Sequence, residues 1–216
     1  MRLILVGPPG SGKGTQAKLL SQRLGLAHIA TGDILREARR LGTPAGRKAA
    51  PFMDNGQLVP DDLVNEMVAD LFRREDRPEH FVFDGYPRTL PQAAALDPVL
   101  RQQFLNIERV VVLIVDDEEV VRRISGRWIC PKDQTPYHVS ANPPGRPAVC
   151  DLCGTPLVQR PDDVEATVRH RQNLYHETTE GLIPFYREQG LVREVQGVGD
   201  IEAIYARIRE ALQSPG

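Results

Sequence analysis

The chain has 216 residues, of which 41% are hydrophobic and 26% are charged, with a formal net charge of −2. This composition is typical of a soluble globular protein, and the length suits one α/β domain with room for an insertion. The near-neutral charge provides no global field for nucleic acid or an anionic membrane, and no apolar run is long enough to span a bilayer. The three cysteines do not form the pattern of a disulfide framework, so we expect a protein of the reducing cytoplasm.

The N-terminal residues predict a strand, a glycine-rich turn and a helix, in that order. Residues 1–6 are apolar except for Arg2 and favour a buried strand, and residues 16–24 carry apolar side chains at helical spacing. Because the apolar start leads directly into the turn at 7–15, we interpret it as a core strand and not as a signal peptide.

Short apolar runs predict four further strands, at 27–30, 80–84, 109–115 and 191–195. Helices are expected over 34–40, up to 55–56, over 59–73, 116–126 and 201–212, and as one long helix that Asp162 and Asp163 cap and that runs to about 187. Five strands alternating with helices predict an α/β fold with a parallel sheet covered on both faces. Ligands of such folds gather at the carboxyl ends of the strands. No internal repeat is apparent.

Residues 128–161 interrupt this alternation. They hold all three cysteines and seven prolines, which is too loop-rich for a crossover helix. We therefore expect a small inserted subdomain there.

The turn Gly-Pro-Pro-Gly-Ser-Gly-Lys-Gly-Thr at residues 7–15 predicts a phosphate-binding loop. Its glycines let backbone N–H groups converge on an anion, and the helix that follows adds partial positive charge. Lys13 is placed to contact the β- and γ-phosphates, and Thr15 to face a magnesium ion. Gly14 departs from the general motif, which has Ser or Thr directly after the lysine.

A second motif, Phe-Asp-Gly-Tyr-Pro-Arg-Thr at 83–89, follows the strand at 80–84. Asp84 at that strand end can hold magnesium through water, Gly85 allows a close backbone approach, and Arg88 is a fork-shaped donor. Five arginines fall near the ends of predicted elements, where a site at the sheet edge would lie: Arg36, Arg88, Arg123, Arg160 and Arg171.

Together with the Thr31-Gly32-Asp33 turn and Gln92, these motifs resemble the adenylate kinase family, from Met1 to about Leu212. The resemblance implies a P-loop nucleoside monophosphate kinase fold of the long-lid bacterial type. It divides the chain into a core (1–29, 60–127 and 162–216), an AMP-binding subdomain (30–59) and a lid (128–161). It also implies a monomer that converts ATP and AMP reversibly to two ADP, with magnesium bound to ATP, and so maintains adenine nucleotide balance.

The resemblance assigns residues to each nucleotide. Those expected to bind ATP are Gly10, Ser11, Gly12, Lys13, Gly14, Thr15, Arg123, Arg127, Tyr137, His138 and Gly199. Those expected to bind AMP are Thr31, Gly32, Arg36, Gln57, Leu58, Val59, Gly85, Arg88, Gln92, Arg160 and Arg171. Catalysis is expected of Lys13, Asp84, Arg88, Arg123, Arg160 and Arg171. Phosphoryl transfer needs such charge stabilisation and no general base, because the oxygen of the accepting phosphate is already nucleophilic.

The expected lid contains two short ligand pairs, Cys130 with Asp133 and Cys150 with Cys153. Two pairs at this spacing predict a structural zinc site with four protein ligands, since aspartate is an acceptable zinc ligand. The resemblance agrees, because many lids of this family carry a structural zinc at these positions. Others hold a metal-free hydrogen-bond network in the same corner, which leaves a pair of reduced thiols as the alternative.

Two other functions compete with this interpretation. A nucleoside monophosphate kinase that prefers UMP or CMP is the nearest, although the long lid, and by resemblance Thr31 and Gln92, favour adenine. A non-catalytic zinc-ribbon protein that binds nucleic acid is the other, but residues 128–161 hold only Lys132, Arg146, Arg160 and His138 as basic residues. We therefore expect small nucleotides as partners, and neither nucleic acid nor a membrane.

Overall fold

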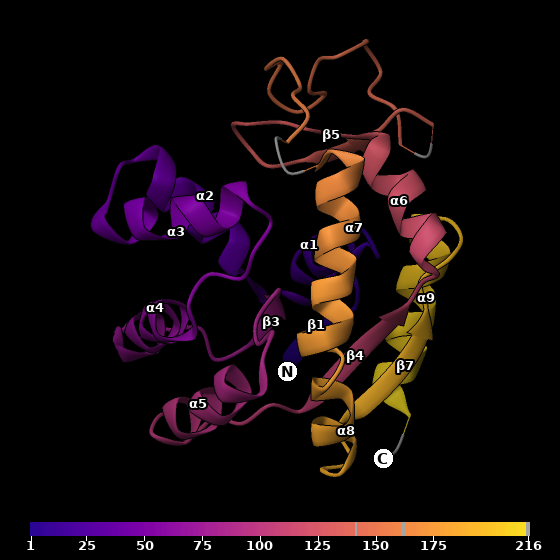
Figure 1. Cartoon of the computed structure of the whole chain (residues 1–216). Coiled ribbons are helices and arrows are strands. Elements are labelled where there is room, and N and C mark those ends of the chain that lie inside the picture. The colour runs from indigo at the N-terminus through magenta and orange to yellow at the C-terminus, as the bar shows by residue number, and fades with distance from the viewer. Residues whose placement is uncertain (141, 161–162, 215–216) are drawn as a thin grey trace.

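A computed structural model describes residues 1–140, 142–160 and 163–214 of the chain. At its centre is a five-stranded sheet in the order β2-β3-β1-β4-β7 (Figure 1). The strands are β1 (Arg2–Val6), β2 (Ala27–Ala30), β3 (Phe81–Asp84), β4 (Arg109–Ile114) and β7 (Val192–Gln196). All neighbouring strands of this sheet are parallel, which confirms the predicted sheet.

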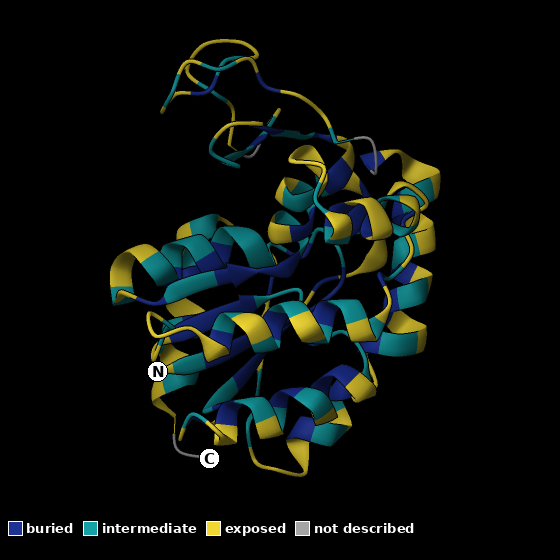
Figure 2. Ribbon diagram, turned by 90° about the vertical axis from the view of Figure 1, so that its left-hand side faces the viewer, coloured by how far each residue is buried: buried dark blue, intermediate teal, exposed yellow. Residues whose placement is uncertain are grey.

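Helices connect the strands and cover both faces of the sheet (Figures 1 and 2). They are α1 (Lys13–Leu24), α2 (Thr31–Arg40), α3 (Pro44–Asp54), α4 (Asp61–Arg73), α5 (Leu90–Arg101), α6 (Asp117–Ser125), α7 (Glu165–Leu174), the π-helix η2 (Tyr175–Thr179), α8 (Leu182–Arg187) and α9 (Ile201–Gln213).

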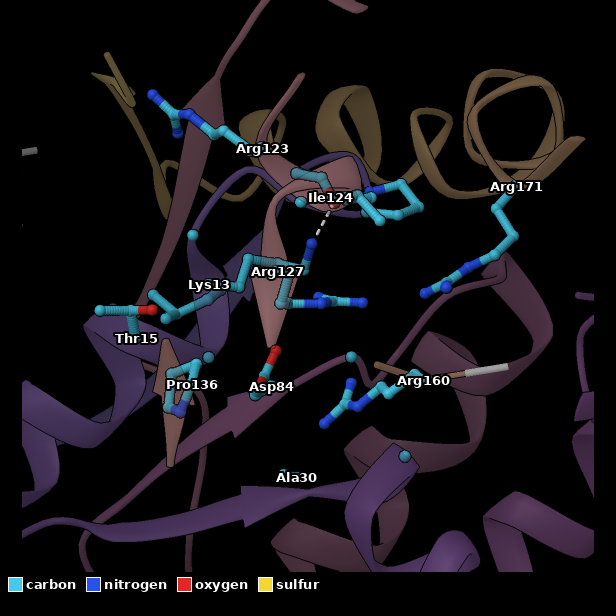
Figure 3. Close-up of a pocket in the computed structure, with 18 of the residues that line it drawn as sticks. Lys13, Thr15, Ala30, Asp84, Arg123, Ile124, Arg127, Pro136, Arg160 and Arg171 are labelled. Atoms are coloured by element: carbon cyan, nitrogen blue, oxygen red, sulfur yellow. Dashed lines mark hydrogen bonds between the residues drawn. The ribbon is translucent and has the colours of Figure 1, made fainter. Parts of the chain in front are cut away.

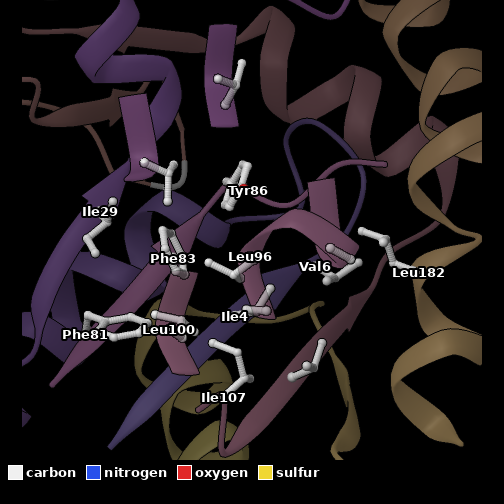
Figure 4. Packing of buried hydrophobic residues seen from close by; sticks show 14 of the residues in the cluster. Ile4, Val6, Ile29, Phe81, Phe83, Tyr86, Leu96, Leu100, Ile107 and Leu182 are labelled. Atoms are coloured by element: carbon white, nitrogen blue, oxygen red, sulfur yellow. The ribbon is translucent and has the colours of Figure 1, made fainter. Parts of the chain in front are cut away.

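Alternation along the buried strands divides the core into two layers. Ile4 and Val6 of β1 pack with the side chains of α4, α5 and α8 on one face, in the cluster that Figure 4 shows. Leu3 and Leu5 pack on the opposite face with α1 and α9. Because successive side chains of a strand point to opposite faces, an all-apolar strand of this kind requires cover on both sides.

Some details of the helices differ from the sequence-based expectation. The sequence analysis did not identify α5, because Pro91 and Pro98 disfavour helix in a simple pattern. Pro91 lies in the first turn, where its missing N–H costs nothing, and the Thr89 hydroxyl caps the helix by accepting from the Gln92 N–H at 3.2 Å. Helix α2 begins at Thr31, so the Thr31-Gly32-Asp33 turn is its first turn and not its cap.

The long helix expected to end near residue 187 is interrupted. A π-helix, η2, separates α7 from the short helix α8. The residue at the N-cap of α7 is Val164, whereas Asp162, which was expected to share the capping role, lies outside the described residues.

The expected insertion has a small sheet of its own, formed by β5 (Arg127–Ile129) and β6 (Pro136–His138), which pair antiparallel. In Figure 1 this segment lies above the carboxyl ends of the main strands, beyond α6 and α7. No described helix is both long and apolar enough to cross a membrane.

Helices α2 and α3 pack so closely that a glycine is required where they meet. A Cβ added at Gly46 of α3 would lie 2.2 Å from the backbone carbon and oxygen of Ala38 in α2. Such contact is far inside van der Waals separation, so any larger side chain must push the two helices apart.

We predict that Gly46→Ala lowers the free energy of unfolding by about 1–3 kcal/mol, the usual cost of overpacking. Denaturant unfolding followed by circular dichroism measures it. The matched control is Gly181→Ala, whose added methyl would meet its nearest atom, the Thr178 carbonyl oxygen, at 3.6 Å. Equal stability of the two variants would contradict the close packing of α2 on α3.

Candidate active site

A cleft of about 990 Å³ opens at the carboxyl ends of β1, β2 and β3. Its walls come from the loop between β1 and α1, from α2 to α4, from α6 and β5, and from α7. Among the described residues that line it, nine are lysine or arginine and three are aspartate or glutamate. This excess of positive charge suits a highly anionic ligand.

The glycine-rich loop at 7–15 curls around the side chain of Lys13. The Lys13 ammonium donates to the carbonyl oxygens of Gly7 at 2.6 Å and Pro8 at 2.8 Å, and lies 3.4 Å from the Ser11 hydroxyl. Gly10 has φ of +84°, and a Cβ there would lie 2.7 Å from a side-chain carbon of Ile124. The loop thus holds a cation at the N-terminus of α1, a position that favours phosphate.

Close approach of Asp84 explains the glycine that departs from the general phosphate-loop motif. A Cβ at Gly14 would lie 3.1 Å from the Asp84 carboxylate, which ends β3. Serine or threonine at position 14 would therefore crowd this carboxylate. Thr15, one residue later, lines the cleft in its place.

The environment of Lys13 lowers the pKa of its ammonium group. Burial, with smaller contributions from Arg88, Arg171 and Arg127, lowers the pKa of Lys13 to about 7, although Asp84 opposes the shift. A second anion in the cleft would raise this pKa again by favouring the charged form.

Asp84 is ionised at the floor of the cleft. Burial alone would raise its pKa, but the His28 side chain and the Lys13 ammonium outweigh burial and hold the pKa of Asp84 below its usual range. The His28 Nε2 lies 3.5 Å from the carboxylate. Sequence analysis missed His28; the signal was a polar residue in the otherwise apolar run at 27–30.

Four predicted arginines reach the cleft from different elements. Arg127, Arg160 and Arg171 extend into the same space (Figure 3). Arg127 of β5 forms a two-point ion pair with the buried Asp163, including Nε to Oδ2 at 2.9 Å. Arg123 of α6 donates from Nε to Glu119 at 2.7 Å.

These acidic partners hold the guanidinium groups of Arg123 and Arg127 in place, which limits the conformational entropy lost when an anion binds.

The other end of the cleft centres on the Gly85 carbonyl oxygen. It accepts from the Thr31 hydroxyl at 2.9 Å and from Arg88 Nε at 2.8 Å. Gly85 has φ of +78°, and a Cβ there would lie 2.7 Å from the Arg88 guanidinium. Apolar side chains of the surrounding helices and loop form a slot beside these groups: Leu35, Met53, Leu58, Val59 and Val64.

The structure brings nearly all the predicted nucleotide-binding residues together. The following line the one cleft: Gly10, Gly12, Lys13, Gly14, Thr15, Thr31, Gly32, Arg36, Gln57, Leu58, Val59, Asp84, Gly85, Arg88, Gln92, Arg123, Arg127, Tyr137, His138, Arg160, Arg171 and Gly199. Ser11 does not; it is fully buried within the loop, beside Lys13.

Side chains of Lys18 and Arg160 join the segment 128–160 to the rest of the protein across the cleft. Lys18 of α1 donates to the Gln134 carbonyl oxygen at 2.7 Å, and Arg160 lies 3.4 Å from the Asp33 carboxylate of α2. Sequence analysis did not identify Lys18, because a lone lysine on a helix face carries no signal of a distant backbone partner.

The four expected metal ligands converge away from the cleft. One potential ligand atom from each of Cys130, Asp133, Cys150 and Cys153 lies within 4.8 Å of the others. The Sγ atoms of Cys130 and Cys153 are 3.5 Å apart, and the Cys150 Sγ lies 3.3 Å from Asp133 Oδ2. A tetrahedral zinc site with Zn–S of about 2.3 Å places sulfurs about 3.8 Å apart, so the four residues fit a structural zinc ion.

A short repeat, which the sequence analysis overlooked, builds this cluster. Residues 130–136 and 150–156 share the pattern Cys-x-x-Asp/Cys-x-Thr-Pro. In each turn the fourth residue after the first cysteine donates its N–H to that cysteine's carbonyl oxygen at 2.9 Å, from Gln134 and Gly154 respectively. Both residues have positive φ, so the two turns present their ligands alike.

Comparison with known proteins gives a consistent result. A family model described as adenylate kinase matches residues 5–191. The chain is 47% identical to an adenylate kinase of Symbiobacterium thermophilum and 46% identical to one of Chloroherpeton thalassium, each over 99% of both chains. It is 42% identical to an adenylate kinase of Ruminiclostridium cellulolyticum over 98% of this chain and 99% of that one.

The depressed pKa of Lys13 predicts proton uptake on binding of a polyphosphate. At pH 8 a group with a pKa of about 7 is mostly neutral, and phosphates around it raise the pKa toward its ordinary value of about 10.4. Binding of ATP at pH 8 is therefore expected to take up nearly one proton per site, and affinity falls as pH rises above 7.

Titration calorimetry in two buffers of different ionisation enthalpy measures this uptake. Lys13→Met is the control and should abolish it. The same uptake in the wild type and in Lys13→Met would show that another group titrates.

Proposed function

The chain belongs to the adenylate kinase family and is a nucleoside monophosphate kinase, and we propose from this premise how its cleft divides the reaction ATP + AMP = 2 ADP among its residues. One observation supports this proposal above all. A single cleft contains the phosphate loop, an apolar subsite and the arginines that lie between them. Two nucleotides placed base-outward in such a cleft meet phosphate to phosphate.

The donor half of the cleft is the part that includes the phosphate loop. We propose that the backbone of residues 10–15 and the Lys13 ammonium hold the ATP phosphates. Arg123 and Arg127 then lie against the adenine and the phosphates, with Tyr137, His138 and Gly199 completing the site. The position of the loop at the N-terminus of α1 supports this assignment, since both backbone N–H groups and the helix dipole favour an anion there.

The acceptor half is the slot between α2, α3 and α4. Its apolar side chains suit a purine, and Arg36 and Arg88 at its inner end suit the single phosphate of AMP. Thr31 and Arg88 share the Gly85 carbonyl oxygen, which fixes the guanidinium of Arg88 beside the phosphate position. Gln92 lies at the edge of the slot, where its amide would form hydrogen bonds with the base of AMP.

Arginines make the transfer possible by stabilising the charge that spreads over the moving phosphoryl group. Arg88, Arg123, Arg160 and Arg171 are assigned this role, together with Lys13. The oxygen of AMP that accepts the phosphoryl group is already anionic, so no side chain has to remove a proton. Arg88, Arg123 and Lys13 are held by protein oxygen atoms, so little reorganisation of these groups is needed during the reaction.

Magnesium accompanies ATP in this family, and the residues present fit it. Asp84 is an ionised carboxylate at the cleft floor, and the Thr15 hydroxyl lines the same wall; both are oxygen ligands of the kind magnesium prefers. Asp84, through water, and Thr15 would hold the ion, which supplies charge neutralisation at the β- and γ-phosphates.

We further propose that residues 30–59 and 128–161 are mobile subdomains on a core of residues 1–29, 60–127 and 162–216. Closure over both nucleotides excludes water, which would otherwise accept the phosphoryl group. The contacts of Lys18 with Gln134 and of Arg160 with Asp33 are candidates for closed-state latches. Since one chain supplies both subsites, we infer a monomer; the free thiols favour a reducing cytoplasm.

The test of the function is an ADP-production assay with ATP as donor and AMP, UMP, CMP or GMP as acceptor. We expect AMP to give the highest kcat/KM by at least tenfold. A preference for UMP or CMP would contradict the AMP assignment, and loss of activity with every acceptor would favour the nucleic-acid-binding alternative.

The four residues that fit zinc suit a structural metal site and not a catalytic one. All four ligands come from the protein, which leaves no open position for chemistry, and the segment around them has a core of only a few buried side chains. We propose that one zinc ion holds this segment in shape, because small loop-rich modules need such a staple.

We predict one equivalent of zinc per chain by elemental analysis. Cys130→Ala should lose the metal and lower the melting temperature, Asp133→Cys should keep it, and Leu152→Ala is the control. Leu152 is 75% exposed and lies between two ligands, so its loss should change neither quantity. Well under half an equivalent of metal in the wild type, with an unchanged melting temperature of Cys130→Ala, would contradict the proposal.

A further inference from the structure

Gln92 is almost fully buried, with 2% of the residue exposed, and yet it lines the cleft. Its amide is engaged on both sides. The side-chain oxygen accepts from the backbone N–H of Arg88 at 2.7 Å, and the side-chain nitrogen donates to the Asp61 carboxylate at 2.7 Å.

These two partners allow only one orientation of the Gln92 amide. A carboxylate can only accept hydrogen bonds and a backbone N–H can only donate. If the amide turned over, its NH₂ would face the Arg88 N–H and its oxygen would face the Asp61 carboxylate. Both contacts would then be repulsive, in a place where water cannot relieve them.

An amide group has two N–H donors and two oxygen lone pairs, and each partner uses one of them. What remains for a ligand is one N–H beside one lone pair, in a fixed order. Adenine presents a donor at its 6-amino group beside an acceptor at N1, which matches that order in one placement. Hypoxanthine and guanine present an acceptor at O6 beside a donor at N1, which is the reverse order.

We propose that Asp61 is a positioning residue that sets the base selectivity of the acceptor site by fixing the orientation of the Gln92 amide. The inference rests on the proposed function, in which the slot beside Gln92 receives the base of AMP. Asp61 reaches no nucleotide in this account; it acts through Gln92.

The position of Asp61 is itself well defined. It is the first residue of α4, and its second carboxylate oxygen accepts from the Thr89 hydroxyl at 2.8 Å. Thr89 also caps α5, the helix that carries Gln92. The Asp61 carboxylate therefore joins the starts of two packed helices, α4 and α5. The Tyr86 hydroxyl also contacts α4, because it donates to the Asn65 side chain at 2.8 Å.

The experiment compares AMP with IMP as acceptors, at saturating ATP. IMP differs from AMP only in carrying O6 and N1–H in place of the 6-amino group and N1, so the pair isolates the order of donor and acceptor. For Asp61→Ala we expect the AMP-to-IMP ratio of kcat/KM to fall by about tenfold, mainly through the two KM values. The KM for ATP should not change.

Asp62→Ala is the matched control. Asp62 is the next residue in the same helix turn and is exposed, so its loss removes a charge from the start of α4 without touching Gln92. Its AMP-to-IMP ratio should equal that of the wild type. Asp61→Asn keeps the shape and is the second variant if Asp61→Ala folds poorly; we expect its ratio to fall as well, because an amide at position 61 accepts either orientation of Gln92.

A double-mutant cycle separates positioning from any direct effect. In a Gln92→Ala background, Asp61→Ala should leave the AMP-to-IMP ratio unchanged within about twofold. An unchanged ratio in Asp61→Ala alone, or an equal fall with and without Gln92, would overturn the inference while the kinase function stood. A wild type that does not phosphorylate AMP would instead overturn the proposed function.

Discussion

Like charges forced together at one edge of the sheet are the constraint on which this structure depends. The described lining of the cleft holds nine lysine or arginine side chains and three carboxylates. Lys13 reflects this environment, because burial, and to a smaller extent the neighbouring arginines, lowers its pKa to about 7. Such a cleft is electrostatically unfavourable when empty and becomes favourable when phosphates enter it.

The protein keeps these cations in place with partners set back from the cleft. Glu119 holds Arg123, the buried Asp163 holds Arg127, and Asp33 lies against Arg36 and Arg160. Since these arginines belong to the core, the proposed lid and the proposed AMP-binding subdomain, phosphate that binds among them links all three parts. In this account, the phosphates that neutralise these arginines on binding also favour closure of the proposed lid and the proposed AMP-binding subdomain.

Much of the fold follows from local pattern, because a parallel sheet covered on both faces needs continuous apolar strands. The runs at 27–30, 80–84 and 109–115 therefore predicted β2, β3 and β4 closely. Helix α5 was not predicted, because its prolines disfavour a helix in a simple pattern and its start depends on the Thr89 cap. The π-helix in the segment 163–187 has no signature in composition or periodicity.

The residues of the candidate site likewise fall into those that the sequence predicted and those that it did not. Motifs with a fixed chemical purpose, such as the phosphate loop and the Asp84-Gly85 turn, could be identified in sequence, and the cleft gathers them. Contacts between distant segments could not: His28 beside Asp84, Lys18 beneath Gln134, and Asp61 on Gln92 each join residues whose proximity only the fold creates. The metal-ligand repeat was present in the sequence, but its Asp in place of Cys obscured the likeness.

Direct transfer between two nucleotides in one closed cleft is tested most directly by a single-turnover experiment with ATP labelled at the γ-phosphate. With AMP present, the account predicts that the label appears in the β-phosphate of the ADP formed from AMP, with none on the protein and almost none as inorganic phosphate. Label retained on the protein, or released mainly as inorganic phosphate, would contradict it.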